Sequence, residues 1–444
     1  MKIRIFAIFC TCIINLYAKL MSVPFITEPD SIQRLGWECC TEHMHCHIFS
    51  SIYGISLANL RTDRKKWLSI MTDPSLSRII YGLGKDEDGV REGLFLKPYP
   101  SAPMGYTHFN SPYGICIDTA LYLGNQNWTF IYVVDGGNNR IVRLKYDAAA
   151  ESLVHHDYIS EGFFNKPRGI SCVADPIGGS YIVVADAGNN RIVIYKMNPD
   201  GSYVLKMNYG TEGNGVGQFK FPQGVSISQE PGQQGNYYIY VADKKNHRLV
   251  CLKYFATDNT IEWRNVYNDP GDSAWFCGIV SNPFYCVYTT DCRNHKIWVF
   301  TPELTELLYT YGEEGYGTGQ FESPTDICII GDEIAITEDW TATTGIQYFK
   351  IIPEIREFYP EPQNFDATED SVKINFRVDE TAHYLTMEVA GRKIFENQYF
   401  VPGHYSVYWD GRGADGKVVL PGNYTIRIRC QQEVIATAGV TVKG

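Results

Sequence analysis

The residue types with the clearest potential for chemistry lie together near the N-terminus, in the segment Cys39-Cys40-Thr41-Glu42-His43-Met44-His45-Cys46-His47. Thiolates and imidazoles at such short spacing are ligands that zinc and copper ions accept. The default interpretation is a leader segment, with a disulfide between Cys46 and Cys39 or Cys40. A haem is disfavoured because the C-x-x-C-H attachment pattern is absent. The candidate metal ligands are Cys40, His43, His45, Cys46 and His47.

Local motifs of catalysis are missing from the rest of the chain. There is no G-x-S-x-G elbow, no H-E-x-x-H and no phosphate-binding Walker loop. Glycine-rich runs at residues 210–219 and 312–321 lead into a Pro and an apolar stretch, so they are interpreted as linkers. A site assembled from separate repeats would leave no local motif, so an enzyme is not excluded. We predict no cofactor, with a calcium or zinc ion as the alternative.

A box of apolar residues, an Asp, a polar turn and further apolar residues occurs four times, with steps of 51, 57 and 48 residues between successive Asp residues. Such a period marks repeated small sheets, as in a β-propeller. Each box is expected to form two strands joined by a tight turn, with the Asp capping the turn and the Arg or Lys lying along the sheet surface. The motif residues are Asp135, Asn138, Arg140, Asp186, Asn189, Arg191, Asp243, Asn246, Arg248, Asp291, Asn294 and Lys296.

Two histidines fall inside these boxes. His247 and His295 occupy the position of Asn139 and Asn190 in the other copies, so we interpret them as repeat residues and not as metal ligands.

Three features of residues 50 to about 350 resemble the NHL-repeat family. They are the boxes, the linkers with Gln218-Phe219 and Gln320-Phe321, and openings such as Pro167-Arg168-Gly169-Ile170. The resemblance implies an all-β fold, a propeller whose blades are four-stranded antiparallel sheets. Blades are expected to open near Pro112, Pro167, Pro222, Ala274 and Pro324.

A sixth blade is expected from the N-terminal side. There, Ile52-Tyr53-Gly54-Ile55-Ser56 resembles a blade opening and Asp63-Arg64-Lys65-Lys66-Trp67 a degenerate box. Six blades are predicted, with five or seven as alternatives. One group related to this family, the peptidyl-hydroxyglycine lyases, holds a metal in the channel through His residues from separate blades. This chain has few His residues outside the repeat positions.

The character of the chain changes after Ile352, where Pro353, Pro360 and Pro362 indicate a linker. Alternating apolar residues and Gly/Asp turns then predict a small β-sandwich. The run from Trp409 to Lys417, WDGRGADGK, resembles FlgD-type immunoglobulin-like domains over about residues 363 to 444, and it is similar to the sorting domains of type IX secretion. The resemblance implies a bacterial secreted protein. Trp409 is expected in the core.

The N-terminus resembles a secretory signal, with basic Lys2 and Arg4, an apolar segment from Ile5 to Leu16 and a small residue, Ala18, for cleavage. Of the 13 Cys residues, most are expected as buried thiols, with Cys286–Cys292 as one candidate disulfide. The predicted organisation is a signal peptide at 1–18, a leader at 19–47, the propeller at 48–352, a linker at 353–362 and the immunoglobulin-like domain at 363–444.

These features predict a non-enzymatic exported protein, located outside the cell, at its surface or in the periplasm. Its propeller face would bind a protein, peptide or glycan, and its C-terminal domain would serve sorting, attachment or assembly into a surface complex. No transmembrane span is expected in the mature chain. The net charge of −11 argues against a nucleic-acid partner, which requires a basic surface. The alternative is a metal-dependent propeller enzyme, lyase-like or lactonase-like.

Overall fold

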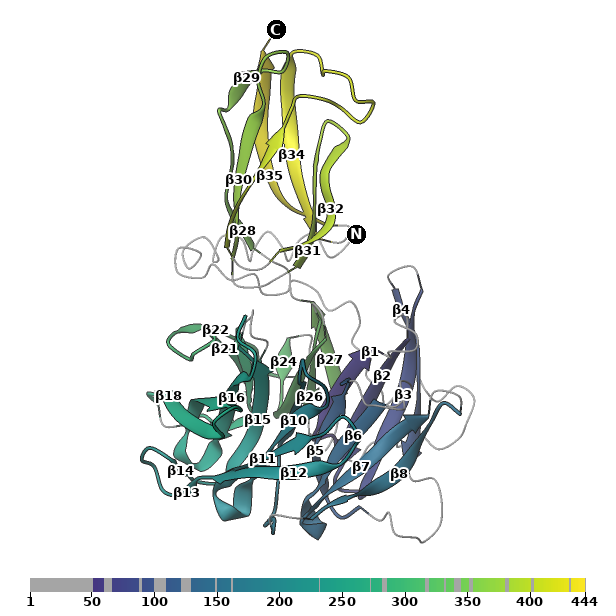
Figure 1. The fold of residues 1–444 in the computed structure, drawn as a ribbon, viewed down its shortest axis with the longest axis vertical. Helices are drawn as coiled ribbons and strands as arrows, with labels where there is room; N and C mark the ends of the chain where they lie inside the picture. Colours follow the sequence, from purple (N-terminus) through teal and green to yellow (C-terminus); the bar gives the residue numbers. More distant parts are fainter. Residues whose placement is uncertain are drawn as a thin grey trace. The chain divides into compact units, whose positions relative to one another are not determined.

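The computed structural model describes two compact units of the chain, one ending at Phe349 and one beginning at Lys350 (Figure 1). The predicted signal and the Cys/His segment lie outside the described residues. The described residues are 51–59, 66–87, 90–99, 109–120, 129–147, 150–160, 163–230, 232–271, 273–281, 286–315, 319–330, 333–338, 345–350, 354–379, 383–400, 403–430 and 433–443.

Within the described part of the first unit, six antiparallel sheets follow one another along the chain, five with four strands and the last with three. They are the blades of a propeller, numbered 1 to 6 below. Their strands are β1 (Ile55–Asn59), β2 (Lys66–Asp73), β3 (Arg78–Glu87), β4 (Val90–Tyr99); β5 (Pro112–Asp118), β6 (Thr129–Asp135), β7 (Arg140–Asp147), β8 (Ser152–Ile159); β9 (Ile170–Ala174), β10 (Ser180–Asp186), β11 (Arg191–Met197), β12 (Tyr203–Tyr209); β15 (Pro222–Gln229), β16 (Asn236–Asp243), β17 (Arg248–Phe255), β18 (Thr260–Asn268); β19 (Phe276–Ser281), β20 (Val287–Asp291), β21 (Lys296–Phe300), β22 (Leu307–Tyr311); and β25 (Pro324–Ile330), β26 (Glu333–Glu338), β27 (Gly345–Lys350).

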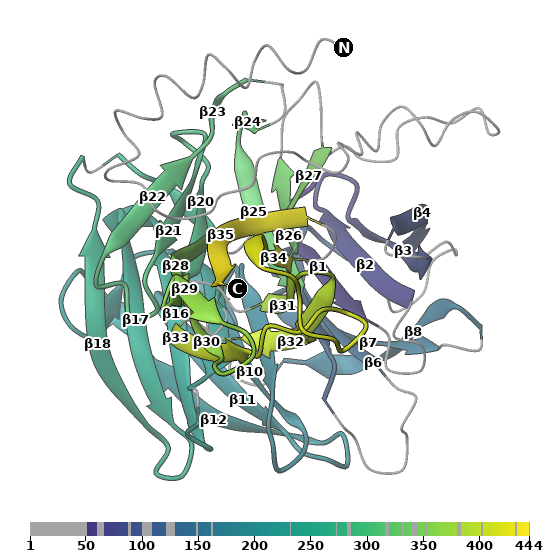
Figure 2. The ribbon, with the colours of Figure 1, turned by 90° about the horizontal axis from the view of Figure 1, so that it is seen from above.

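The blades close into a ring. The innermost strands β1, β5, β9, β15, β19 and β25 contact one another in this order, and β25 contacts β1 again. Figure 2 shows β1 beside β25, although they lie at opposite ends of the propeller sequence. The predicted six-bladed propeller is therefore confirmed, and the sixth blade comes from the N-terminal side.

Glycines allow the inner strands to approach so closely. A Cβ placed on Gly169 would lie 2.5 Å from the carbonyl oxygen of Gln223 and 3.0 Å from the Cα of Gly224 in the next blade. Gly54, Gly114, Gly224 and Gly278 occupy the same position in their blades and face the same obstruction. The sixth blade has Asp326 there, and its Oδ2 accepts a hydrogen bond from the backbone N–H of Ile55 at 3.1 Å.

Gly169→Ala is therefore expected to force two blades apart and to lower the free energy of unfolding by about 1–3 kcal/mol, as overpacking does elsewhere. Chemical denaturation followed by circular dichroism would measure this. Gly271→Ala is the matched control, because the atom nearest to its Cβ is the Ser273 hydroxyl oxygen at 3.3 Å. Equal stability of the two variants would contradict the close approach.

The Asp of each box is buried and organises the turn between the second and third strands. Asp243 accepts hydrogen bonds from the backbone N–H of Lys220 at 2.7 Å, from Asn246 Nδ2 at 2.7 Å and from Arg248 Nε at 2.8 Å. The Arg forms an ion pair with the carboxylate, because a buried carboxylate requires a counter-charge. The expectation that the Arg lies along the sheet surface is therefore wrong. The same three contacts recur around Asp135 (Asn110, Asn138, Arg140) and Asp186 (Asn165, Asn189, Arg191).

The expected capping of the turn is confirmed for Asp291, which accepts from the backbone N–H groups of Arg293 and Asn294 at 3.2 Å, and is wrong for the other three boxes. The short 3-10 helices of these turns, η2 (Gly136–Asn138), η3 (Ala187–Asn189) and η4 (Lys244–Asn246), receive no side-chain cap from the Asp, which binds the segment before the inner strand instead. His247 and His295 have φ of 51° and 59°, like Asn139 and Asn190 at 53° and 55°. The histidines therefore occupy the left-handed position of the turn.

Three blades carry degenerate boxes. In blade 6, Glu338 replaces the Asp and accepts from the backbone N–H of Glu322 at 3.2 Å and from Gln347 Nε2 at 2.6 Å. In blade 5, Trp298 Nε1 donates to Asp291 at 3.2 Å, where blades 1 to 4 use an Arg. In blade 1, the box lies at Asp73, which accepts from the backbone N–H of Ser51 and from Arg78 Nε, each at 3.3 Å. The expected degenerate box at 63–67 is wrong, because Trp67 lies inside β2, which ends at Asp73.

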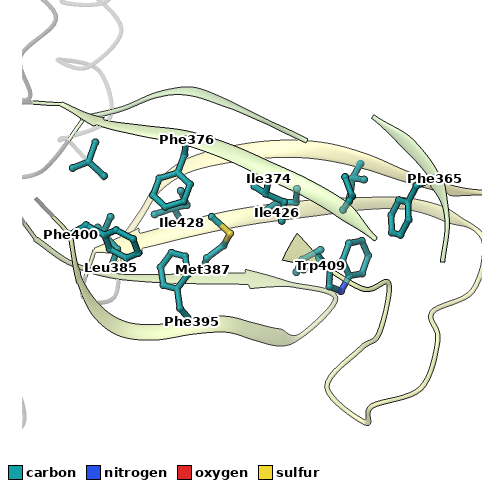
Figure 3. Packing of buried hydrophobic residues seen from close by; sticks show 14 of the residues in the cluster. Phe365, Ile374, Phe376, Leu385, Met387, Phe395, Phe400, Trp409, Ile426 and Ile428 are labelled. Carbon is teal, nitrogen blue, oxygen red and sulfur yellow. The ribbon is translucent and has the colours of Figure 1, made fainter. Parts of the chain in front are cut away.

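The second unit is a sandwich of a three-stranded and a five-stranded sheet. Figure 3 shows Ile374 and Phe376 of one sheet facing Leu385, Met387 and Ile428 of the other. Trp409 is fully buried in this core, as expected. The residues predicted as a linker form the edge strand β28, which pairs with β30. The strands are β28 (Glu354–Glu361), β30 (Val372–Asp379) and β33 (Gly403–Trp409) in one sheet, and β29 (Asn364–Asp366), β31 (His383–Val389), β32 (Arg392–Phe400), β34 (Gly422–Cys430) and β35 (Glu433–Lys443) in the other.

Candidate functional site

The turns of the boxes lie on the same face of the propeller as the segments that lead into the inner strands. Backbone hydrogen bonds join the two, as from Gly188 N–H to the Asn165 carbonyl at 2.8 Å and from Cys292 N–H to the Trp275 carbonyl at 3.1 Å. We call this the turn face. It comprises residues 74–77, 136–139, 187–190, 244–247 and 292–295, with the connections 109–111, 163–169, 210–221, 273–275 and 319–323.

Four large apolar side chains of the turn face remain in contact with solvent, while Val154, Ile177 and Val204 are exposed elsewhere on the described propeller. Phe163 is 89% exposed, Val216 75%, Leu76 48% and Trp275 42%. Contacts with neighbouring turns place them, since Asn189 Nδ2 donates to the Phe163 carbonyl and Arg248 Nη1 to the carbonyl of Asn214, close to Val216. Exposed apolar residues that occur singly need no explanation, but a group on one face indicates an interaction surface.

At the centre of this face are the residues that precede the five closely packed glycines and Asp326, which we call the ring positions. In chain order these residues are Tyr53, Tyr113, Arg168, Gln223, Cys277 and Thr325. Gln223 of blade 4 donates a hydrogen bond to the Tyr53 hydroxyl of blade 1, on the far side of the ring. Tyr53 also packs edge-on against Tyr113, with ring centroids 4.9 Å apart. These side chains span the centre of the ring at this level.

Cations stack on aromatic rings around this centre. The Arg168 guanidinium lies 3.6 Å from the ring centroid of Tyr113, and the Lys244 ammonium lies 5.0 Å from that of Trp275. Arg293 approaches Trp275 at 5.4 Å. Such contacts orient the cations without neutralising them. Tyr113, Arg168, Lys244 and Trp275, one from each of four successive blades, are called the mouth cluster below.

The electrostatics of the mouth cluster are unbalanced. Burial, and next the positive charge of Arg168, lower the pKa of Lys244 to about 8, although Asp291 acts in the opposite direction. In the described part of the chain, no carboxylate forms an ion pair with either Arg168 or Lys244. The Arg168 Nε is buried and has no hydrogen-bond partner among these residues. The cluster therefore presents positive charge and an unsatisfied donor.

A disulfide lies beside this cluster. The structure joins Cys277 to Cys292, so the expected Cys286–Cys292 pair is wrong. Cys277 precedes the ring glycine and Cys292 follows the box Asp, whereas Cys286 is buried at the start of the neighbouring strand, next to Val287.

The candidate metal ligands Cys40, His43, His45, Cys46 and His47 are outside the described residues, so their role stays a prediction. Among the residues that the structure does describe, no group of three or more His, Cys, Asp or Glu side chains converges as metal ligands. Sequence reasoning missed the mouth cluster, because its four residues come from four blades and form no local motif.

No family model and no curated protein matches the chain. Among solved structures, it is similar to a virginiamycin B lyase from Staphylococcus aureus (14% identity, 76% of this chain, 94% of that chain, TM-score 0.40). It is also similar to a gluconolactonase from Xanthomonas campestris (11%, 74%, 97%, 0.43). A third is PorZ, described as a surface component of the type-IX secretion system of Porphyromonas gingivalis (12%, 83%, 50%, 0.36). At these identities the likeness concerns the fold alone. In the described part of the chain, no helix is long and apolar enough to cross a membrane. The chain is a β-propeller protein.

Proposed function

We propose that this chain is an exported, non-enzymatic binding protein that recognises a protein partner through the turn face of an NHL-type propeller. The observation that carries the proposal is the exposure of Phe163 and Trp275 on the face that also holds Tyr113, Arg168 and Lys244. Tyr, Trp and Arg are the residue types that contribute most at protein interfaces. Peptides and glycans remain the alternative ligands.

Export and surface attachment rest on the sequence. The basic and apolar N-terminus supports export, and the WDGRGADGK run supports an immunoglobulin-like module for sorting, attachment or assembly into a surface complex. The sandwich has its own buried core around Trp409 and Phe376, which suits a separate attachment module.

The enzyme alternative has less support. A hydrogen bond between Gln223 and Tyr53 spans the ring where a channel metal would be reached from the turn face. The corresponding residues of the other blades are Tyr113, Arg168, Cys277 and Thr325, and none of them carries a carboxylate or an imidazole.

The test is affinity capture of partners from the exported and envelope fractions of the native host, with the purified full chain immobilised and the bound proteins quantified by mass spectrometry. Phe163→Asp with Trp275→Asp is expected to lower recovery of a specific partner by about tenfold or more, because truncated hot spots weaken binding to that extent. Ile177→Asp is the matched control, because Ile177 is 80% exposed in a turn at the opposite ends of the strands.

Two results would contradict the proposal. One is loss of the same partner from the Ile177→Asp variant. The other is hydrolase or lyase turnover by the purified chain that disappears when Gln223, which lies at the centre of the ring, is replaced.

A further inference from the structure

Two cations meet at the mouth of the ring although the net charge of the chain is −11. Arg168 comes from the segment before β9, and Lys244 is the first residue of the turn after β16, one blade further on. The Arg168 guanidinium lies 5.7 Å from the ring centroid of Phe221, and the ammonium of Lys245, the residue after Lys244, lies 4.9 Å from the same centroid. The two segments therefore adjoin, and the positive charge of Arg168 contributes to the lowered pKa of Lys244. Like charges held together in a half-buried setting are unfavourable. The charge of Asp291 offsets this only in part, because burial and Arg168 still lower the pKa of Lys244.

Backbone hydrogen bonds fix the segments that carry the two cations, and the rings of Tyr113 and Trp275 orient their charged groups. The Arg168 N–H donates to the Ala185 carbonyl at 2.9 Å, and its own carbonyl accepts from Gly114 N–H at 2.9 Å. The carbonyl of Lys244 accepts from His247 N–H at 3.2 Å, which closes the turn. A site whose charged groups are fixed before binding loses little conformational entropy when a ligand arrives.

The Arg168 guanidinium has one face on Tyr113 and an unsatisfied Nε–H at its edge. A planar guanidinium matches a carboxylate or phosphate through two parallel hydrogen bonds, whereas an ammonium acts as a point charge beside it. Arg168 as a whole is half-buried, so an anion on the accessible part of its guanidinium offsets a charge that no carboxylate of the described residues pairs with.

We propose that Arg168 and Lys244 form a carboxylate-binding site that anchors an acidic peptide segment of the protein partner on the turn face. This inference rests on the proposed function. The carboxylate lies against the guanidinium edge and beside the ammonium, and the neighbouring apolar residues Phe163 and Trp275 contact the rest of the segment. A peptide is favoured over a glycan because Trp, Tyr and Arg together around a desolvated centre characterise protein-binding hot spots.

The test measures binding of a fluorescent acetyl-hexaglutamate peptide to the full chain by anisotropy, at concentrations up to roughly 1 mM, where contacts of this strength are detectable. We expect Arg168→Gln and Lys244→Gln each to weaken binding by about tenfold or more, as loss of a charge-assisted hydrogen bond does. Arg168→Lys keeps the charge and should lose less. Lys220→Gln, an exposed lysine of the same face, is the matched control and should change affinity by less than about twofold.

Acetyl-hexaglutamine, polygalacturonate and inorganic phosphate distinguish the chemistry. The proposal is overturned if the neutral peptide binds equally well, if polygalacturonate binds and hexaglutamate does not, or if phosphate binds more tightly than hexaglutamate. It is also overturned if Lys220→Gln weakens binding as much as Arg168→Gln. If hexaglutamate fails to bind while the Phe163 and Trp275 variant still loses its captured partner, the carboxylate site is wrong and the proposed function stands. If that variant also captures normally, both are wrong.

Discussion

Replacing Asp243 with Ala is expected to lower the free energy of unfolding of the propeller by about 3–5 kcal/mol, the usual consequence of removing one partner of a buried ion pair. The Asp243 side chain is fully buried and that of Arg248 is 6% exposed. Burial raises the pKa of Asp243 even though Lys220, Asn246 and Arg248 donate to it. The ion pair as a whole therefore adds little stability. When Asp243 is removed, however, the buried charge of Arg248 loses its counter-ion and has little contact with water.

Asp135→Ala is the matched control for this prediction. It removes the same three hydrogen bonds, but the Arg140 left behind is 22% exposed and can turn its charge toward solvent. We expect a loss smaller than that of Asp243→Ala by about 1 kcal/mol or more, because charges in contact with water need no counter-ion. Guanidinium denaturation monitored by far-UV circular dichroism would compare the two. Equal losses would show that the buried charge of Arg248 is not what makes Asp243 important.

Asp326→Asn is expected to remove a pH dependence from the stability of the propeller. Burial raises the pKa of Asp326 to about 7 from its ordinary value of 3.8. The folded state therefore holds the proton more tightly than the unfolded state, so stability is greatest below about pH 4 and falls as the pH rises to about 7. The upper bound is about 4 kcal/mol, and we expect about half because the side chain keeps some contact with solvent.

The asparagine variant retains an oxygen for the Ile55 N–H but cannot ionise. Between pH 4.5 and pH 8, its free energy of unfolding should lack the fall with rising pH that Asp326 causes in the wild type. At pH 8, its free energy of unfolding should exceed that of the wild type. Asp326→Gly, which restores the residue of the other five blades, should also be level but less stable by about 1 kcal/mol, since the hydrogen bond is lost. Urea denaturation across this pH range is the measurement. An identical slope in wild type and Asp326→Asn would contradict a carboxyl buried in the ring.

The sequence allowed the central boxes to be predicted because Asp, Asn and Arg recur there at fixed spacing. It did not reveal the box of blade 1, where Pro74-Ser75-Leu76-Ser77 shares no residue with the glycine and asparagine turns. Only the five-residue step from Asp73 to Arg78 survives, and one such step occurs easily by chance. Ser77 nevertheless has φ of 49°, so the backbone of the turn is kept although its residues changed.

The mouth cluster was beyond local sequence patterns. Arg168 and Lys244 are 76 residues apart and are brought together only because the ring places the start of one blade beside the turn of the next. Each looks like a surface cation when considered alone. Their proximity, and the lack of a carboxylate partner among the described residues, appear only once the blades are closed.

Recognition through the turn face can be tested by hydrogen exchange of the full chain with and without its captured partner. We expect slower exchange of backbone amides at 163–169, 244–247 and 273–275 when the partner is bound. We expect no change at 175–179 and 256–259, which lie at the opposite ends of the strands. Protection confined to those opposite turns, or to the C-terminal sandwich, would contradict it.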